Sequence, residues 1–161
     1  MRIGITGSSG FLGSHLTKAL RQYDDTEVTV LQRNSLGSFP TINEIRPFVH
    51  DLDLIYHVAG VNRGTNKEIL RGNVEATFNL IEAIKKSKNS FPRIVFTSSS
   101  QVYKPLVQSK KIINESHKTE PATIFATPSN IPILAASTTA GGRLSYLVST
   151  INCASVSVTF M

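Results

Sequence analysis

Three glycines within seven residues, directly after a short apolar run, constrain most strongly how this chain can fold. The run covers residues 2–6, and Gly7, Gly10 and Gly13 follow it ahead of an amphipathic stretch. A strand that enters a glycine-rich turn and then a helix brings backbone N–H groups and the positive end of the helix dipole together. This arrangement is typical of a site for a dinucleotide pyrophosphate. The G-x-x-G-x-x-G spacing differs from the commoner G-x-G-x-x-G, and the alternative interpretation is a turn without a ligand.

Each glycine has its own expected role. Gly7 permits the tight turn, Gly10 lets the backbone approach phosphate oxygens, and Gly13 lets the next helix pack closely on the sheet. That helix is expected over 11–22, with an apolar side made of Phe11, Leu12, Leu16 and Leu20.

Apolar runs alternate with amphipathic stretches along the first hundred residues. The patterning predicts strands at 2–6, 28–31, 54–58 and 93–97, and helices over 11–22, 42–49 and 65–88. The last helix would carry its apolar side on Ile69, Val74, Phe78, Ile81 and Ile84. Parallel strands need crossover connections, and helices supply them. We therefore expect an α/β fold with a doubly wound parallel sheet, Rossmann-like in type.

The composition changes near residue 120. Arg143 is the one charged residue after Glu120, and residues 121–161 are rich in Ser, Thr and Ala without a clear helical period. A half-buried strand over 156–160 is the clearest pattern in that region. We therefore expect a dinucleotide-binding domain over 1–120 and an atypical, low-charge tail over 121–161.

Charge and cysteine content narrow the classes of partner and compartment. The chain has a net charge of +6, and its densest basic cluster, at 85–88, lies where a predicted helix ends. Cations complement the dipole there, and no aromatic residues are interleaved to stack bases, so nucleic-acid binding is not expected. The polar tail makes a poor membrane span. Cys153, the single cysteine, fits a reducing compartment, and no signal peptide precedes the first strand, so a cytoplasmic protein is expected.

Small or polar residues follow the later expected strands. Ala59 and Gly60 come after the third strand, where ligands bind in open α/β sheets, and their small side chains leave room for a ring. Asn73 lies in a predicted helix, where Asn usually faces solvent. The hydroxyls at 98–100 either orient a substrate oxygen or belong to a simple loop. We interpret His57 as a packed core histidine and not as a catalyst.

Four segments, in order, resemble the extended short-chain dehydrogenase/reductases, a family of nucleotide-sugar epimerases, dehydratases and reductases. They lie within residues 3–111 and read GITGSSGFLGSHL, LIYHVAGVNR, GNVEATFNLIEAI and IVFTSSSQVY. Residues 57–63 and the short connection at 34–52 most resemble the hexulose reductases of capsule and O-antigen synthesis. That resemblance implies a UDP-linked deoxysugar as substrate and NADPH as cofactor, with no metal site.

The resemblance also implies which residues bind the cofactor. The three glycines, with Ser8, Ser9, Phe11 and Leu12, would surround the pyrophosphate. Ala59 and Gly60 would lie along the path of the adenine ribose and the nicotinamide, and Asn73 would help to hold that part. Arg33, with Asn34 beside it, ends the second strand, where an Asp would bond the ribose 2′-OH of NAD(H). An Arg accommodates a 2′-phosphate, so NADP(H) is favoured over NAD(H), although a surface Arg without a ligand is the alternative.

The catalytic residues match the family only in part. Ser99 matches its active-site hydroxyl, and Lys110 fits the lysine of Tyr-x-x-x-Lys. That lysine lowers the pKa of the phenol, so that the tyrosine can transfer a proton near neutral pH. Leu106 stands in the tyrosine position, and Tyr103, seven residues from Lys110, cannot replace it. If this alignment holds, acid–base catalysis of the family type is lost.

The tail departs from the family as well. Relatives are expected to be roughly twice as long, because they carry a substrate-binding half. Residues 122–125 resemble the next core strand, but 126–130 do not supply the Arg-x-x-Asn that should follow. A frame change or deletion in the gene would explain this loss together with the loss of charge; the rival is a truly short product.

Two functional interpretations therefore stay open. One is a truncated homologue of a nucleotide-sugar epimerase or reductase of surface-polysaccharide synthesis, whose activity depends on the alignment that places Leu106 in the tyrosine position. The other is an NADP(H)-binding module, or a partner subunit, that carries out no chemistry. A dinucleotide-binding half without its second domain would expose apolar surface, which favours a homo-oligomer.

Overall fold

A computed structural model describes residues 1–34, 37–87, 91–104, 113, 117–118, 120 and 147–149. Its sheet has the strand order β2-β1-β3-β4-β5, and every neighbouring pair is parallel. The strands are β1 (Arg2–Thr6), β2 (Glu27–Leu31), β3 (Leu54–His57), β4 (Arg93–Thr97) and β5 (Leu147–Ser149). The chain leaves β1 toward β2 and then returns to the other side of β1 for β3, so the direction of winding reverses between β1 and β3.

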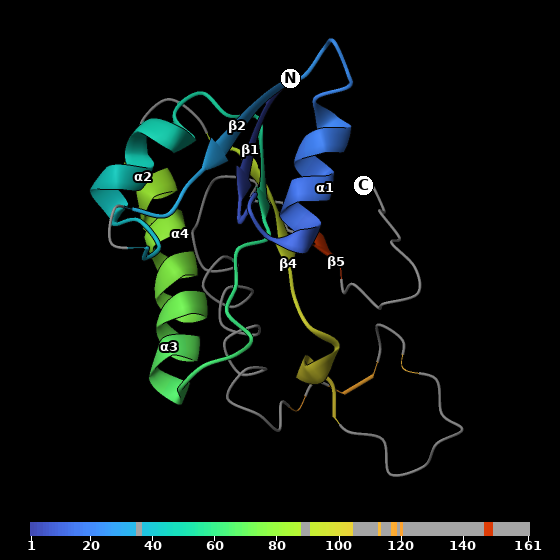
Figure 1. Cartoon of the computed structure of the whole chain (residues 1–161), viewed down its shortest axis with the longest axis vertical. Coiled ribbons are helices and arrows are strands. Elements are labelled where there is room, and N and C mark those ends of the chain that lie inside the picture. The colour runs from blue at the N-terminus through green and yellow to red at the C-terminus, as the bar shows by residue number, and fades with distance from the viewer. Residues whose placement is uncertain are drawn as a thin grey trace.

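Helices cover both faces of this sheet. They are α1 (Phe11–Leu20), α2 (Ile42–Val49), α3 (Asn66–Leu70) and α4 (Ala76–Lys86), with a π-helical turn η1 (Arg71–Glu75) between the last two and a 3₁₀ turn η2 (Ser100–Val102) after β4. Figure 1 shows α1 on one face and both α2 and α4 on the other. The doubly wound, Rossmann-like parallel sheet expected from the sequence is confirmed.

The larger hydrophobic core lies between the sheet and the pair α2 and α4. Side chains alternate along a strand, so Ile55 points to this face together with His57, two residues on. The buried residues of this core are Ile45, Phe48, Val49, Leu52, Ile55, Leu80, Ala83 and Ile84. On β1, Ile3 and Ile5 are fully buried and point to the opposite face, which α1 covers.

Helix α1 buries a different side from the one that its apolar pattern predicts. Phe11 is 86% exposed and Leu12 is 37% exposed, whereas Gly13 and Thr17 are buried. The Thr17 hydroxyl donates to the Gly13 carbonyl oxygen at 2.7 Å, which satisfies a polar group in the packed face. The small residues Gly13 and Thr17 allow close packing of α1, and Leu16 and Leu20 are half-buried beside them.

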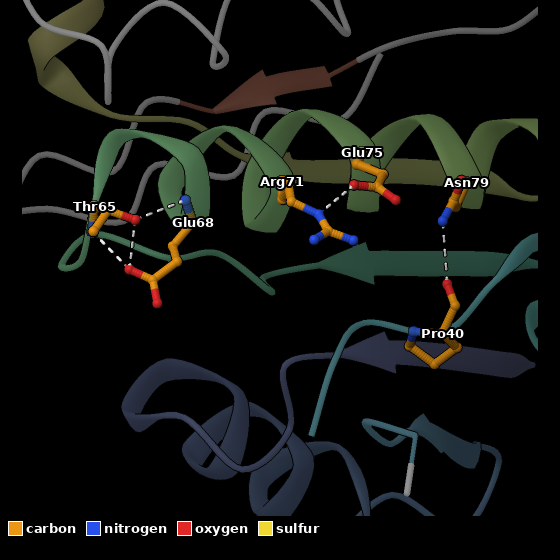
Figure 2. A network of polar contacts seen from close by, with 6 residues as sticks. All are labelled: Pro40, Thr65, Glu68, Arg71, Glu75 and Asn79. Carbon is orange, nitrogen blue, oxygen red and sulfur yellow. Dashed lines mark hydrogen bonds and ion pairs between the residues drawn. The ribbon is translucent and has the colours of Figure 1, made fainter. Parts of the chain in front are cut away.

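The long helix begins at a capping box. Glu68 N–H donates to Thr65 Oγ1 at 3.3 Å, and Thr65 N–H donates to Glu68 Oε2 at 2.7 Å (Figure 2). These bonds satisfy N–H groups that have no partner within the helix. The Thr65 backbone and hydroxyl bonds also lower the pKa of the Glu68 carboxyl, because they stabilise its charged form.

The helix does not continue as one regular α-helix. In η1 the Ala76 N–H donates to the Arg71 carbonyl oxygen, five residues back, so this turn holds one residue more than an α-turn. Phe78 is 57% exposed, contrary to the predicted apolar side, whereas Ile69 and Ile84 of that side are buried together with Leu80 and Ala83.

Further polar contacts hold the sides of this helix. Arg71 Nε pairs with Glu75 Oε2 at 3.1 Å, and Asn79 Nδ2 donates to the Pro40 carbonyl oxygen at 3.3 Å (Figure 2). The second bond links α4 to the segment that leads into α2.

Most element boundaries lie close to those expected. β1, α2 and β4 have the predicted bounds, while β2 begins one residue earlier and β3 ends one residue earlier. β5 was not expected, and the strands proposed at 122–125 and 156–160 lie outside the described residues. Within the described part of the chain, no helix is long and apolar enough to cross a membrane, and no cluster of His, Cys, Asp or Glu could hold a metal ion.

Candidate cofactor site

The expected site residues leave the sheet at one edge. Thr6 pairs in register with Leu31 on one side and with His57 on the other, and His57 pairs with Phe96. The glycine turn, the segment with Arg33, the segment with Ala59 and the segment with Ser99 therefore follow the carboxyl ends of four neighbouring strands. Ligands of open α/β sheets bind at this edge, where the winding reverses.

The glycine turn is shaped by two close backbone approaches. Gly7 has φ 73°, which is left-handed, and a Cβ on it would lie 2.7 Å from both N and Cα of Ala59. A Cβ on Gly13 would overlap the Gly7 carbonyl oxygen. Gly7 therefore brings the turn against the segment after β3, and Gly13 brings α1 against the turn, as the sequence predicts.

Gly10 differs from these two. It is the N-cap of α1 with φ −78° and ψ 171°, an extended conformation that any residue adopts, and it has no side chain to cap the helix. A Cβ there would lie 3.3 Å from the Gly7 carbonyl oxygen, a tight but not impossible contact. The first-turn N–H groups and the positive end of the α1 dipole therefore lie beside an open backbone. Ser8 is half-buried in this turn, and Ser9 is exposed.

Phe11 stands exposed at the start of α1, next to that backbone. Its ring lies 4.7 Å from the His15 ring, measured between centroids, and His15 Nδ1 bonds the Phe11 carbonyl oxygen at 2.8 Å. Leu12 is also partly exposed. Together they give the mouth of the glycine turn an apolar border.

Asn73 holds the segment after β3. Its Oδ1 accepts the Val61 N–H at 2.9 Å, and its Nδ2 donates to the Val61 carbonyl oxygen at 2.7 Å. Nδ2 also donates to the Ile69 carbonyl oxygen at 2.9 Å, beside the turn where the helical hydrogen-bond pattern changes. A Cβ on Gly60 would lie 3.1 Å from Asn73 Oδ1. Asn73 is therefore half-buried and points inward, although Asn in a helix usually faces solvent.

His57 is a core histidine, as interpreted from the sequence, and it is 1% exposed. Its Nδ1 bonds Thr6 Oγ1 at 2.6 Å, and its Nε2 bonds Thr77 Oγ1 at 3.0 Å. The Thr6 oxygen also accepts the Ala59 N–H at 3.2 Å. Burial lowers the pKa of His57 to about 4, so the ring is neutral at physiological pH.

Arg33 and Asn34 lie just beyond β2 and bond residues 37 and 38. Arg33 Nη1 donates to the Gly37 carbonyl oxygen at 3.0 Å, and Asn34 Oδ1 accepts the Ser38 N–H at 3.0 Å. The Gly37 N–H in turn donates to the Asn34 carbonyl oxygen at 2.9 Å. These bonds hold an exposed guanidinium at the same sheet edge as the glycine turn.

Ser99 lies two residues beyond β4 and directly before the 3₁₀ turn η2. Its Oγ accepts the Gln101 N–H at 3.2 Å, and its carbonyl oxygen accepts the Val102 N–H at 3.1 Å. The side chain is half-buried. Leu106 and Lys110 lie outside the described residues, so the catalytic pairing inferred for this region stays a prediction.

The structure brings one group of expected residues into contact and leaves others apart. Gly7, Ala59, Gly60 and Asn73 adjoin one another at the winding reversal. Arg33 and Ser99 lie further along the edge, after β2 and β4. Thr6 and Thr77 were not singled out from the sequence. They could have been noticed because both are polar at positions where the strand and helix patterns require burial. Buried polar groups need hydrogen-bond partners.

Comparison with known proteins agrees with this arrangement. The chain matches the NAD dependent epimerase/dehydratase family over residues 3–128. It is 34% identical over 103 residues to UDP-2-acetamido-2,6-beta-L-arabino-hexul-4-ose reductase of Pseudomonas aeruginosa, a match that covers 63% of this chain and 26% of that protein. The curated relatives it matches are thus considerably longer than the matched region, and many of them act on UDP-linked sugars by name.

Solved structures show the same fold. UDP-glucuronic acid 4-epimerase from Bacillus cereus, in complex with UDP-glucuronic acid and NAD, superposes with a TM-score of 0.66 at 22% identity, over 85% of this chain and 51% of that one. RMD from Pseudomonas aeruginosa, complexed with NADPH, superposes with a TM-score of 0.69 at 22% identity, over 84% and 47%. Together with the motifs, the family match over most of the chain is decisive: this chain belongs to the NAD-dependent epimerase/dehydratase family.

Proposed function

We propose that this chain is the NADP(H)-binding part of a nucleotide-sugar epimerase or reductase of capsule or O-antigen synthesis. The observation that carries the proposal is the contact of the glycine turn with the Ala59 segment at the winding reversal between β1 and β3. Sheets of this order bind nucleotides at that place. The hexulose reductase similar to this chain supports the sugar-modifying class.

The residues present fit a dinucleotide. Gly7 and Gly13 are required by the fold, but the conformation of Gly10 requires no glycine, so a ligand that needs the open backbone explains it. The N–H groups of the first α1 turn would hold the pyrophosphate, with Ser8 and Ser9 beside them and the ring of Phe11 at the border. When bound, the nicotinamide supplies or accepts a hydride.

Arg33 supports the phosphorylated cofactor. Its guanidinium follows β2, the strand whose end meets the adenosine ribose in folds of this kind, and the Gly37 carbonyl oxygen holds it there. An Arg presents several N–H donors to a phosphate, whereas an Asp would bond a free 2′-OH. One structural neighbour carries NADPH and another carries NAD, so the preference rests on Arg33 and its neighbour Asn34.

Ser99 would act on the sugar. The Gln101 N–H engages its Oγ as an acceptor, which leaves the hydroxyl proton as the group to donate to a substrate oxygen. Ser99 would thereby orient a sugar carbonyl or hydroxyl of a UDP-linked substrate.

Leu106 favours a second candidate function. A leucine in the place of the catalytic tyrosine has no proton to transfer, whatever Lys110 contributes. The chain would then bind NADP(H) as a sensing module or as a partner subunit without chemistry. Incubation of the purified chain with NADPH and UDP-linked hexuloses separates the two candidates: oxidation of NADPH at 340 nm supports the enzyme, and binding without oxidation supports the module.

We also propose that the residues beyond about 126 are not those of the original domain. The loss of charge after Glu120, the absence of Arg-x-x-Asn from 126–130 and a family match that ends at residue 128 support this. Resequencing the gene and translating its three frames tests it. A second frame that supplies Arg-x-x-Asn and a substrate domain would support a frame change, and its absence would contradict it.

A further inference from the structure

A chain of buried hydrogen bonds runs from β1 through β3 to α4. It joins Thr6, His57 and Thr77, and all three side chains are nine-tenths or more buried. It ends at the Ala59 N–H on one side and at the Asn73 carbonyl oxygen on the other. Both ends therefore lie at the candidate site, while the middle lies in the core.

The position of each proton in this hydrogen-bond network is set by the neighbouring group. The Thr77 hydroxyl donates to the Asn73 carbonyl oxygen at 2.7 Å, so its oxygen accepts from His57 Nε2–H. The Nδ1 of a neutral ring is then an acceptor and takes the Thr6 hydroxyl proton. The Thr6 oxygen keeps its lone pairs for the Ala59 N–H. One tautomer of His57 thus satisfies the whole network.

The segment after β3 is consequently held at two points. Ala59 is bonded by Thr6, and Val61 is bonded by the Asn73 amide through both its N–H and its carbonyl oxygen. Gly60 lies between them, and Ala59 is in backbone contact with Gly7. The network therefore fixes this segment against the glycine turn.

We propose that His57 is a positioning residue for dinucleotide binding, acting through Thr6 and Thr77 on the segment Ala59–Val61. The inference rests on the proposed function, because the bound dinucleotide passes along that segment. His57 itself touches no ligand. It holds two strands and one helix in the arrangement in which the segment and the glycine turn face the same space.

Two substitutions at one position test this role. His57→Leu fills the space without polar atoms, while His57→Asn places an amide oxygen near the position of Nδ1, where it can accept the Thr6 proton. The readouts are the NADPH dissociation constant from isothermal titration calorimetry and the exchange rate of the Ala59 amide by NMR. His57→Leu should weaken NADPH binding about tenfold and speed exchange of the Ala59 amide. The NADPH dissociation constant of His57→Asn should stay within about threefold of the wild-type value.

A purely structural role would give a different result. In that case both variants would lower the melting temperature without a difference in NADPH affinity, and the inference would be overturned. If His57→Leu does not fold, Thr77→Val and its partner Thr77→Ser, which keeps the hydroxyl, provide the same comparison from the helix side. Wild-type protein that binds no dinucleotide would overturn the proposed function itself. If the wild type binds NADPH and both His57→Leu and Thr77→Val bind it with unchanged affinity, only the positioning role is overturned.

Discussion

A β-carbon added to each of the three turn glycines would meet a different obstacle. On Gly7 it would meet the backbone of Ala59 and require a left-handed conformation, and on Gly13 it would overlap a carbonyl oxygen. On Gly10 it would meet only the Gly7 carbonyl oxygen, at 3.3 Å, in an ordinary extended conformation. Folding and ligand binding can therefore be separated by substitution within one turn.

Gly10→Val should remove NADPH binding while the protein still folds, because its side chain would occupy the space in front of the α1 N–H groups. An affinity loss of about a hundredfold or more is expected, with at most about 1 kcal/mol lost from folding at the N-cap. Calorimetric titration and thermal unfolding measure the two effects. Gly13→Ala is the control: it should lose the fold, and normal affinity in Gly10→Val would contradict this account of the turn.

Arg33→Asp should shift cofactor preference from NADPH toward NADH. The change removes the donors for a 2′-phosphate and adds an acceptor for a ribose 2′-OH. The dissociation constant of NADH divided by that of NADPH should fall by about tenfold or more. This is the effect of losing a charge-assisted contact and gaining repulsion. Arg63→Asp, after β3, serves as the matched charge control. An unchanged ratio in Arg33→Asp would refute the role given to Arg33.

Among the elements, the strands were easier to predict than the faces of the helices. Short apolar runs between turn residues identify β1 and β4 without ambiguity, and the glycine spacing located the start of α1. The prediction of which side of α1 is buried was wrong, because Gly13 and Thr17 pack closely and Phe11 is exposed. Local periodicity carries no information about such close packing.

Two other features were also beyond the sequence. The π turn η1 interrupts the long helix, and Phe78, which the sequence pattern places on the apolar side, is exposed. β5 pairs with β4 from far along the chain, within a region of weak pattern. In the site, the glycines and Asn73 could be found from motifs. The bonds of Thr6 and Thr77 to His57 could not, since they join residues 20 and 51 positions apart.

The buried histidine that links β1, β3 and α4 makes folding stability depend on pH. The ring is neutral in the folded protein, and its folded pKa of about 4 lies below the ordinary value of 6.5. Above pH 6.5 neither state is protonated, and the stability is complete; between pH 6.5 and pH 4 the unfolded state takes up a proton that the folded state does not. About 2 kcal/mol should therefore be lost between pH 7 and pH 5.

Urea unfolding at those two pH values checks this effect. His57→Asn should lack the loss, because no group then titrates at that position. The described groups around the His57 ring are the hydroxyls of Thr6 and Thr77 and the rings of Phe39 and Phe96, none of which titrates in this range. Equal pH dependence in wild type and His57→Asn would contradict the buried neutral ring.

At the scale of the whole molecule, the sheet depends on residues on both sides of the composition change. β1 to β4 come from the first 120 residues, and β5 pairs with β4 through Val95↔Leu147 and Thr97↔Ser149. Without β5, the N–H and carbonyl groups of that edge of β4 would lose their partners. Unpaired strand edges promote association between chains.

A variant that ends at Glu120 should therefore self-associate more than the full chain. It keeps the glycine turn, the Ala59 segment and Asn73, so it should still bind NADPH. Size-exclusion chromatography with light scattering measures the association, and titration measures the binding. A monodisperse variant of unchanged mass would mean that β5 does not protect the sheet edge, and the chain would then be divisible at residue 120 without consequence for assembly.

The most direct test of the central claim is a titration of the purified full chain with NADPH, followed in parallel with NADH. The account predicts saturable binding of one dinucleotide per chain, with a dissociation constant below about 1 mM and a preference for NADPH. It also predicts that this binding disappears in Gly10→Val. If neither dinucleotide binds up to about 1 mM while the protein is folded, the glycine turn is a structural connection only, and the assignment of a cofactor site to this edge of the sheet is wrong.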